Sequence, residues 1–209
     1  MSTYPLSIRT LTSKSALIAL MIISCAASTA VFSADSKRSP LSEEDGWSDN
    51  VGEKDSTYTC PKDTVMIGRA HYGDTESGEV YYKCSTYEPY RQETVISPGT
   101  WSEALTEGKP SGHSYTCPDG TAMVGRQHTG DENGTTTYKC SQVFTGSKLE
   151  EIIPGTTISN LKESDHEAVC PSGQLLIGRQ HHCNGSGSAC DENQYTSYFC
   201  GYMKPMDIK

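Results

Sequence analysis

The chain has 209 residues, a formal net charge of −9 at pH 7 and a mean hydropathy of −0.54. Its acidic balance disfavours nucleic acid and anionic membrane surfaces as partners, because both carry negative charge themselves. The length allows one domain or two.

The N-terminus has the pattern of a secretory signal. Residues 1–15 carry Arg9 and Lys14 and no acidic residue, and the apolar run ALIALMIISCAA follows at 16–27. This run is too short to cross a bilayer comfortably, so no membrane span is expected. A basic start, a short apolar core and small residues after it are typical of a signal peptide. We therefore expect a signal peptide over 1–30 and a secreted protein, extracellular or periplasmic.

The end of the signal leaves two alternatives open. Cleavage is expected after Ala30 or after Ala34, and a flexible linker is expected over 31–44. The sequence IISC at 22–25 also resembles a lipobox, in which Cys25 would be the lipidated residue. The alternative to a secreted protein is therefore a lipoprotein anchored through Cys25.

Three segments of the chain repeat one pattern. They read YTCPKDTVMIGRAHYGDTESGEVYYKCS at 58–85, YTCPDGTAMVGRQHTGDENGTTTYKCS at 115–141 and AVCPSGQLLIGRQHHCNGSGSACDENQYTSYFCG at 168–201. The linkers repeat as well, as VISPGTWS and IIPGTTIS. A regular period of this length indicates a repeat architecture. We define repeat 1 as 45–100, repeat 2 as 101–156 and repeat 3 as 157–209, the last with an insertion at 183–190.

The local signals within each repeat favour strands joined by tight turns. The stretches VMIGR, AMVGR and LLIGR follow turns such as PDG, and TTTYKCS is rich in β-formers. No stretch shows a sustained helical period, and four strands in each repeat would give about twelve. The predicted fold class is all-β with a pseudo-threefold arrangement, resembling a β-trefoil or a β-prism. The alternative is a string of small disulfide-bonded β modules.

The cysteines predict a disulfide framework. Eight remain when Cys25 is set aside, and an even number behind a secretory signal indicates disulfides. One bridge inside each repeat is the arrangement that works equally well in all three copies. The predicted pairs are Cys60–Cys84, Cys117–Cys140 and Cys170–Cys200, with Cys183–Cys190 closing the insertion of repeat 3.

Polar residues recur at matching places in the three repeats. An arginine and a histidine stand two residues apart on an expected strand, so that their side chains share one face. Acidic residues follow on the next turn, and a tyrosine lies on the returning strand. Guanidinium donors, carboxylate acceptors and an aromatic face suit a polyhydroxylated ligand. The candidate ligand-binding residues are Arg69, His71, Asp74, Glu76 and Tyr82 in repeat 1, Arg126, His128, Asp131, Glu132, Asn133 and Tyr138 in repeat 2, and Arg179, His181, Asp191, Glu192, Asn193 and Tyr198 in repeat 3.

Three function classes remain open. The main hypothesis is a lectin-like secreted protein that binds a glycan on a host or competitor surface, alone or with a toxin partner subunit. The second is a structural or protein-binding module in which the repeated motif is only a structural brace. The third is a small secreted hydrolase or transferase that uses His128 and Asp131. Triplication disfavours catalysis, because avidity from several weak sites benefits a binding protein more than an enzyme.

No cofactor and no metal site is expected. His181, His182 and Cys183 form a local metal-like group, but the chain has no Cys-x-x-Cys pair. The GDENG turn offers oxygen ligands without the spaced aspartates of a calcium loop. The insertion of repeat 3 separates His181 from Asp191 by ten residues, so the site in this repeat is expected to differ from the other two.

Overall fold

The computed structural model describes residues 46–73, 77–86, 94–107, 112–130, 134–182 and 194–204. All of them belong to one compact unit, Ser39–Lys209. The expected signal peptide, the linker over 31–44 and Cys25 lie outside the described residues, as do Cys183 and Cys190 of the insertion. Within the described ranges the regular elements are all strands, as the sequence predicts. In these ranges no helix has the length and the apolar composition needed to cross a membrane.

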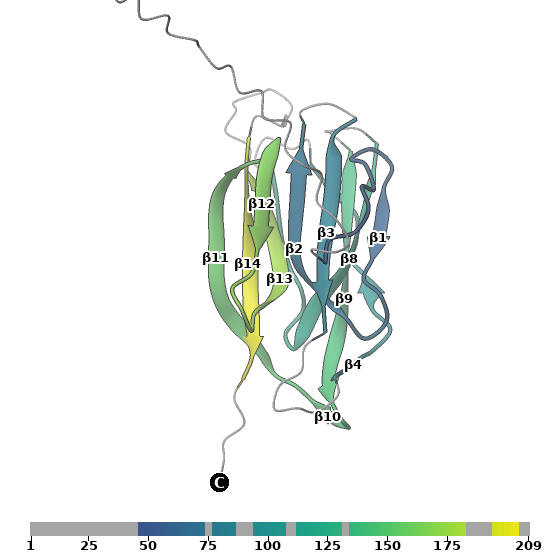
Figure 1. Cartoon of the computed structure of the whole chain (residues 1–209), viewed down its shortest axis with the longest axis vertical. Helices are drawn as coiled ribbons and strands as arrows, with labels where there is room; N and C mark the ends of the chain where they lie inside the picture. Colours follow the sequence, from purple (N-terminus) through teal and green to yellow (C-terminus); the bar gives the residue numbers. More distant parts are fainter. Residues whose placement is uncertain are drawn as a thin grey trace, which may run out of the picture. The chain divides into compact units, whose positions relative to one another are not determined.

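The described residues form fourteen strands, two more than the repeat pattern predicts (Figure 1). The additional strands are short ones contributed by the linkers between the disulfide-bonded hairpins. In chain order the strands are β1 (Thr57–Thr59), β2 (Val65–Tyr72), β3 (Glu79–Ser85), β4 (Thr94–Ile96), β5 (Thr100–Trp101), β6 (Leu105–Thr106), β7 (His113–Thr116), β8 (Thr121–Thr129), β9 (Thr135–Thr145), β10 (Lys148–Leu149), β11 (Ile152–Lys162), β12 (Asp165–Val169), β13 (Leu175–His182) and β14 (Tyr195–Met203).

Each repeat centres on one antiparallel hairpin. The hairpins are β2–β3 in repeat 1, β8–β9 in repeat 2 and β13–β14 in repeat 3. Linker strands extend two of them, because β5 and β6 pair with β9, and β11 pairs with β14. In repeat 1 the same place is taken by a single bridge between Trp47 and Lys83. The linkers are therefore parts of the sheets.

In each repeat the strand just before the first cysteine, here called the first strand of the repeat, pairs with the hairpin of another repeat. β1 pairs with β8, β7 pairs with β13, and β12 pairs with β2, all antiparallel. The exchange therefore runs from repeat 1 to repeat 2, from repeat 2 to repeat 3 and from repeat 3 back to repeat 1. In Figure 1, β12 accordingly lies next to β2, although about a hundred residues separate them along the chain. The repeats do not fold as independent modules.

A glycine in each hairpin makes this exchange sterically possible. The pairing shifts register just before Gly68, Gly125 and Gly178, at the same place in all three hairpins. A Cβ at Gly125 would lie 2.8 Å from the Tyr58 carbonyl oxygen of the incoming strand, and a Cβ at Gly178 would lie 2.5 Å from that of Tyr115. The glycine of the repeated IGR or VGR motif is therefore needed for close approach of two backbones.

Three disulfides flank the shared core. They are Cys60–Cys84, Cys117–Cys140 and Cys170–Cys200, the three pairs that the repeat predicts among the described residues. All three belong to one buried cluster that also contains Met66, Met123 and Leu176 from the three hairpins. One core therefore receives equivalent residues from every repeat, and the polar residues described next lie directly on it.

Candidate functional site

The repeated arginines and histidines point into the protein. Each pair lies on the strand that begins a hairpin, β2, β8 or β13, and alternates with neighbours that face the other side of the sheet. Arg69, Arg126 and Arg179 are 1%, 2% and 1% exposed, and the histidines two residues later are equally buried. Tyr82, Tyr138 and Tyr198 on the returning strands are also buried. The structure thus brings nine of the predicted site residues together, away from solvent.

The other predicted site residues cannot be placed in this way. They are the acidic and amide residues of the turns, and they lie outside the described residues: Asp74, Glu76, Asp131, Glu132, Asn133, Asp191, Glu192 and Asn193. The carboxylates that the structure places beside the arginines come from a different part of each repeat.

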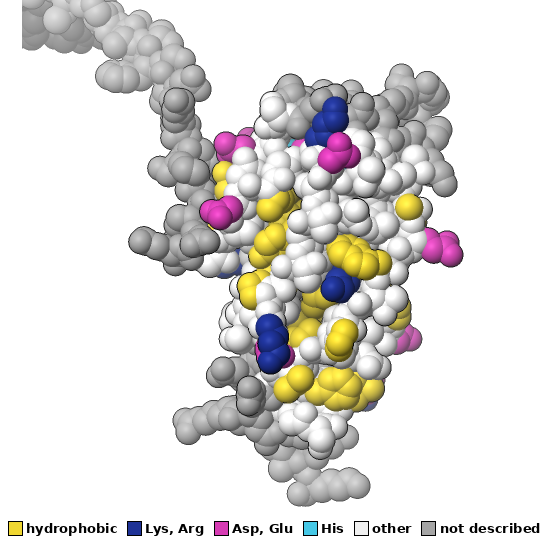
Figure 2. All heavy atoms as spheres, turned by 90° about the vertical axis from the view of Figure 1, so that its right-hand side faces the viewer, with side chains coloured by type: hydrophobic (Ala, Val, Ile, Leu, Met, Phe, Trp, Pro, Cys, Tyr) yellow, Lys and Arg dark blue, Asp and Glu magenta, His cyan; other side chains and the backbone are white. Residues whose placement is uncertain are grey.

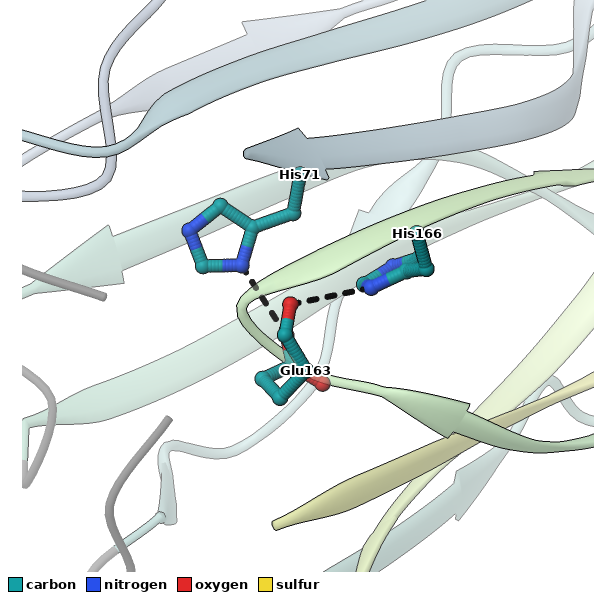
Figure 3. Close-up of side chains that lie close together, drawn as sticks. All are labelled: His71, Glu163 and His166. Atoms are coloured by element: carbon teal, nitrogen blue, oxygen red, sulfur yellow. Dashed lines mark hydrogen bonds and ion pairs between the residues drawn. The ribbon is translucent and has the colours of Figure 1, made fainter. Parts of the chain in front are cut away.

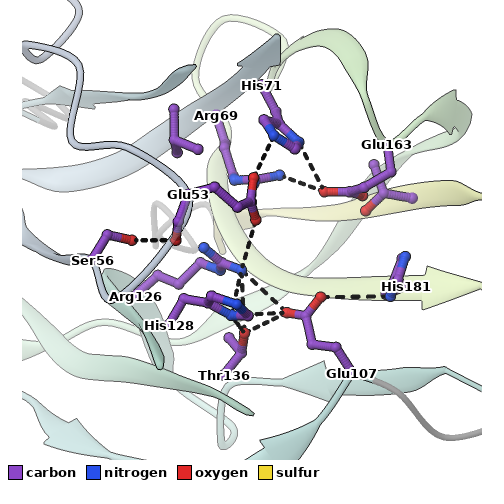
Figure 4. Close-up of polar contacts among 12 residues, drawn as sticks. Glu53, Ser56, Arg69, His71, Glu107, Arg126, His128, Thr136, Glu163 and His181 are labelled. Carbon is purple, nitrogen blue, oxygen red and sulfur yellow. Dashed lines mark hydrogen bonds and ion pairs between the residues drawn. The ribbon is translucent and has the colours of Figure 1, made fainter. Parts of the chain in front are cut away.

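Three buried glutamates complete the site. Glu53, Glu107 and Glu163 precede the exchanged strands β1, β7 and β12, so each exchanged strand carries its glutamate to a neighbouring hairpin. We call the three arginines, the three glutamates and the histidines His71, His128 and His181 the central cluster (Figure 4). The repeated motif does not reveal these glutamates, because its three copies begin at 58, 115 and 168, after each glutamate. Glu53 and Glu163 both lie seven residues before the first cysteine of their repeat, which was the available signal.

The ion pairs of the central cluster form a closed ring. Glu163 lies 2.9 Å from Arg69 Nη1 and 2.8 Å from Arg179 Nη2. Glu107 Oε1 lies 3.2 Å from Arg179 Nη1 and 3.1 Å from Arg126 Nη2. Glu53 Oε1 closes the ring at 4.0 Å from Arg126 and 3.8 Å from Arg69. Three positive and three negative charges thus alternate, which compensates the cost of removing them from water.

Each arginine also donates to the tyrosine of another repeat. Arg69 Nη1 donates to Tyr198 Oη at 2.9 Å, and Arg179 Nη1 donates to Tyr138 Oη at 3.2 Å. Arg126 Nη1 lies 3.4 Å from Tyr82 Oη. The tyrosines therefore join the central cluster to the disulfide-rich core beneath it.

His71 is held between two carboxylates. Its Nε2 forms a very short contact with Glu53 Oε2, and its Nδ1 lies 3.5 Å from Glu163 Oε1. Burial by itself would lower the pKa of His71, but hydrogen bonds to Glu163 and Glu53 outweigh burial and raise it. His71 is accordingly the histidine of the central cluster that is favoured as an imidazolium.

His166 adopts the opposite protonation state. Figure 3 shows it on the other side of Glu163 from His71. Its Nδ1 donates to the main-chain oxygens of Lys162 and Glu163 at 2.9 Å, so its Nε2 accepts from Tyr198 Oη at 2.8 Å. Burial, assisted by the positive charge of Arg69, lowers the pKa of His166 to about 4. A neutral imidazole satisfies both of these hydrogen bonds.

These two shifts predict an optimum of stability near neutral pH. The unfolded chain protonates His166 below about pH 6.5, whereas the folded protein resists protonation down to about pH 4. Between these values His166 alone should lower the free energy of unfolding by about 3 kcal/mol as the pH is lowered. His71 acts in the other direction, because its raised pKa contributes stability that is lost as the pH rises above the unfolded value. Urea unfolding between pH 4 and pH 9 measures both the loss of stability at low pH and the loss at high pH.

Glu53 extends the loss of stability to still lower pH. Burial would raise its pKa, but the hydrogen bond and charge of His71 lower it to about 2, so its contribution is lost below the usual glutamate range. A His166→Asn variant should lose only the share of the slope between pH 6.5 and pH 4 that His166 contributes, because burial also lowers the pKa of His113 and of His181 and these two histidines keep their shares. A wild-type free energy of unfolding that stays constant from pH 6.5 to pH 4 would contradict this account.

Two grooves open on the surface, one in repeat 1 and one built mainly by repeat 2. The Trp47 groove has a volume of about 470 Å³ and is lined by Trp47 and Tyr58 together with Pro61 and Cys84. The Trp101 groove has a volume of about 380 Å³. Its lining contains the matching residues at each of these positions, Trp101, Tyr115, Pro118 and Cys140. The two grooves are therefore built from equivalent residues of two repeats.

The walls of the grooves combine aromatic rings with polar groups, which in the Trp47 groove include the carboxylate of Asp49. Lys83 lies over the Trp47 ring and Lys139 over the Trp101 ring, at 5.4 and 5.7 Å from the ring centres. Ser102 and Gln142 are among the polar residues that line the Trp101 groove. Figure 2 shows a face of the protein on which hydrophobic side chains form an interrupted band among backbone and other side-chain atoms, with scattered lysine, arginine and acidic side chains.

Repeat 3 lacks the aromatic pair of these grooves. Thr157 pairs with Phe199 on β14, at the position where Trp101 pairs with Lys139 on β9. Ala168 stands two residues before the first cysteine of repeat 3, where the other repeats have Tyr58 and Tyr115. The insertion at 183–190 predicts that repeat 3 differs from the other two, and the loss of the aromatic pair is a second, separate difference.

Comparison of the chain with known protein families, characterised proteins and solved structures finds no significant match.

Proposed function

We propose that this protein is a non-catalytic, extracytoplasmic module that binds saccharides in the Trp47 and Trp101 grooves. The observation that carries the proposal is the repetition of a tryptophan, a tyrosine and small polar groups around two equivalent grooves. The apolar face of a sugar ring stacks on aromatic rings, and its hydroxyl groups exchange hydrogen bonds with serine and amide groups. Three disulfides fit a protein that works in an oxidising compartment.

The central cluster acts in this proposal as a structural brace. Its arginines, histidines and tyrosines are nearly inaccessible to solvent, so a glycan in contact with them would have to open the core. The ring of charges instead joins every repeat to both of the others through ion pairs between repeats. We therefore place saccharide binding in the two grooves. The repeated arginines and histidines of the central cluster have the role of a structural brace.

The arrangement of repeats that fits this proposal best is prism-like. Three antiparallel hairpins each receive one strand from another repeat, and their equivalent residues meet in one core. Three sheets around a common axis would place the charges and tyrosines near that axis and the grooves on the outside. This arrangement gives avidity to a ligand that displays several copies of one saccharide.

A Trp101→Ala variant tests the proposal. A glycan array first identifies the saccharide retained by the wild-type protein, and calorimetry then measures its stoichiometry. We expect two saccharides per chain, because repeat 3 has neither the tryptophan nor the tyrosine. Trp101→Ala should weaken binding at its groove by at least about tenfold, as the loss of a central aromatic contact does. The measured stoichiometry should then fall from two to one.

The matched control is Tyr195→Ala. Tyr195 is an aromatic residue that is 43% exposed and does not line either groove, so binding should be unchanged. Equal losses in the two variants, or an array on which no saccharide is retained, would reject the saccharide proposal. The second candidate function, a protein-binding module with the same internal brace, would then be favoured. No described residue points to a toxin partner.

A further inference from the structure

We propose that Glu107, His113 and His181 form a binding site for one transition-metal ion of the Zn²⁺ type. Each residue offers one ligand atom, and these atoms lie within 4.8 Å of one another. A tetrahedral zinc ion with bonds of about 2.0–2.1 Å needs ligand atoms about 3.3 Å apart, which small side-chain rotations can supply. His113 on β7 lies directly opposite His181 on β13, so strand exchange between repeats 2 and 3 assembles the site.

The histidine nitrogens of this cluster lack hydrogen-bond partners. Among the described residues, neither Nδ1 nor Nε2 of His181 has one, and the same is true of Nδ1 of His113. His181 is 2% exposed and His113 is 8% exposed, so bulk water does not compensate these atoms. Buried polar atoms are nearly always paired in folded proteins, and an ion is one of the partners that explain an exception.

The two oxygens of the Glu107 carboxylate face different partners. Its Oε1 faces Arg126 and Arg179, whereas its Oε2 lies 3.6 Å from His181 Nδ1. His113 is tied by its Nε2 to Tyr138 Oη at 2.8 Å, which leaves the Nδ1 side of its ring for a metal. Burial keeps both histidines neutral by lowering their pKa, that of His113 to about 3, and a neutral imidazole is the form that binds metals.

The related cluster of His71, Glu163 and His166 differs in that carboxylates lie beside both ring nitrogens of His71, although these nitrogens too lack hydrogen bonds of regular geometry. Its three residues also lie close enough to hold an ion. His166, however, uses both ring nitrogens for hydrogen bonds, and His71 lies between two carboxylates that favour its protonated form. A proton on His71 therefore takes the place that a metal would need, and we assign no ion to this cluster.

The third equivalent position lacks a ligand. His128 lies beside the first strand of repeat 1, and its main-chain N–H donates to the Ser56 carbonyl oxygen. Ser56 thus stands where His113 and His166 stand in the other two junctions. With a serine in place of the second histidine, this junction offers fewer metal ligands than the other two. The proposal is therefore one ion per chain.

The neighbouring arginines restrict the kind of ion. Arg126 and Arg179 already share the charge of Glu107, so the site offers little to Mg²⁺ or Ca²⁺, which depend on several oxygen ligands. Zn²⁺ binds through imidazole nitrogen as well as carboxylate oxygen and needs only three or four ligands. We expect weaker binding than at a site without nearby positive charges, with the two imidazoles supplying most of the affinity.

The test is titration of the chelator-treated full chain with ZnCl₂. Calorimetry should show one ion per chain. In the NMR spectrum of the wild-type protein, the ring signals of His113 and His181 should shift, while those of the other four histidines keep their positions. This measurement needs no variant and reports on the site even if substitutions impair folding. It is also independent of saccharide binding, so it can fail or succeed whatever the glycan array shows.

Variants then test the assignment. His113→Asn and His181→Asn should each weaken zinc binding by at least about tenfold. His182→Asn is the matched control. His182 is the next residue on β13, so its side chain faces the other side of the strand from His181. It forms a hydrogen bond of 3.0 Å with Ser197 Oγ. Three outcomes would overturn the proposal: no binding by the wild-type protein, undiminished binding by both site variants, or ring shifts at histidines other than His113 and His181.

Discussion

Glu163→Gln should lower the free energy of unfolding by about 3–5 kcal/mol, the cost of leaving buried charges without their partner. Glu163 is 4% exposed and lies within 2.9 Å of Arg69 and Arg179. The amide therefore removes the nearest counter-charge of two buried guanidinium groups and leaves three arginines with two glutamates. Glutamine has nearly the same shape, which excludes a cavity as the cause. Thermal unfolding followed by circular dichroism should show a midpoint lower by about 2–4 °C per kcal/mol.

The control for this variant is Glu151→Gln. Glu151 forms an ion pair of similar length, 3.0 Å, with Lys204, but it is 61% exposed. Because water screens such a pair, its loss should cost no more than about 1 kcal/mol. If the two variants lowered the midpoint equally, the central cluster would not be a brace, and the proposal for its role would fail.

Removal of the disulfides should have the second large effect. A Cys117→Ala and Cys140→Ala double variant should lose about 3 kcal/mol, because the bridge closes a loop with a sequence separation of 23 residues. The other two bridges, with separations of 24 and 30 residues, should contribute about as much each. Full reduction would then remove about 9 kcal/mol, which is comparable with the whole stability of an ordinary domain.

We therefore expect the fully reduced protein to be unfolded at 37 °C. Circular dichroism with and without reductant measures this, and alkylation of the oxidised protein without reductant is the control, since the bridged cysteines offer no thiol. A reduced protein that kept its midpoint within a few degrees would show that the central cluster and the core hold the fold without the bridges. The effects of Glu163→Gln and of reduction should be more than additive if both act on the same core.

The repeated motif shows how far sequence reasoning reached into the site. The spacing of Arg69 and His71 correctly placed the two side chains on one face of a strand, and the same holds for the other repeats. The spacing did not reveal that this face is the buried one, because arginine is normally exposed unless it is paired. The pairing partner of Arg69, Glu163, lies 94 residues away in the chain. A local sequence pattern cannot predict a contact between residues so far apart in the chain.

The sequence by itself determined the all-β character, the three cysteine pairs and the triplicated Arg-x-His motif, because turns, strand composition and repeat spacing are local properties. Only the tertiary structure decided which repeat each first strand joins, which carboxylates meet the arginines, and that the ring of charges lies inside. The physical reason is that a buried charge is tolerated only beside its counter-charges. Here those counter-charges arrive on strands exchanged between repeats, and exchange depends on the packing of the whole chain.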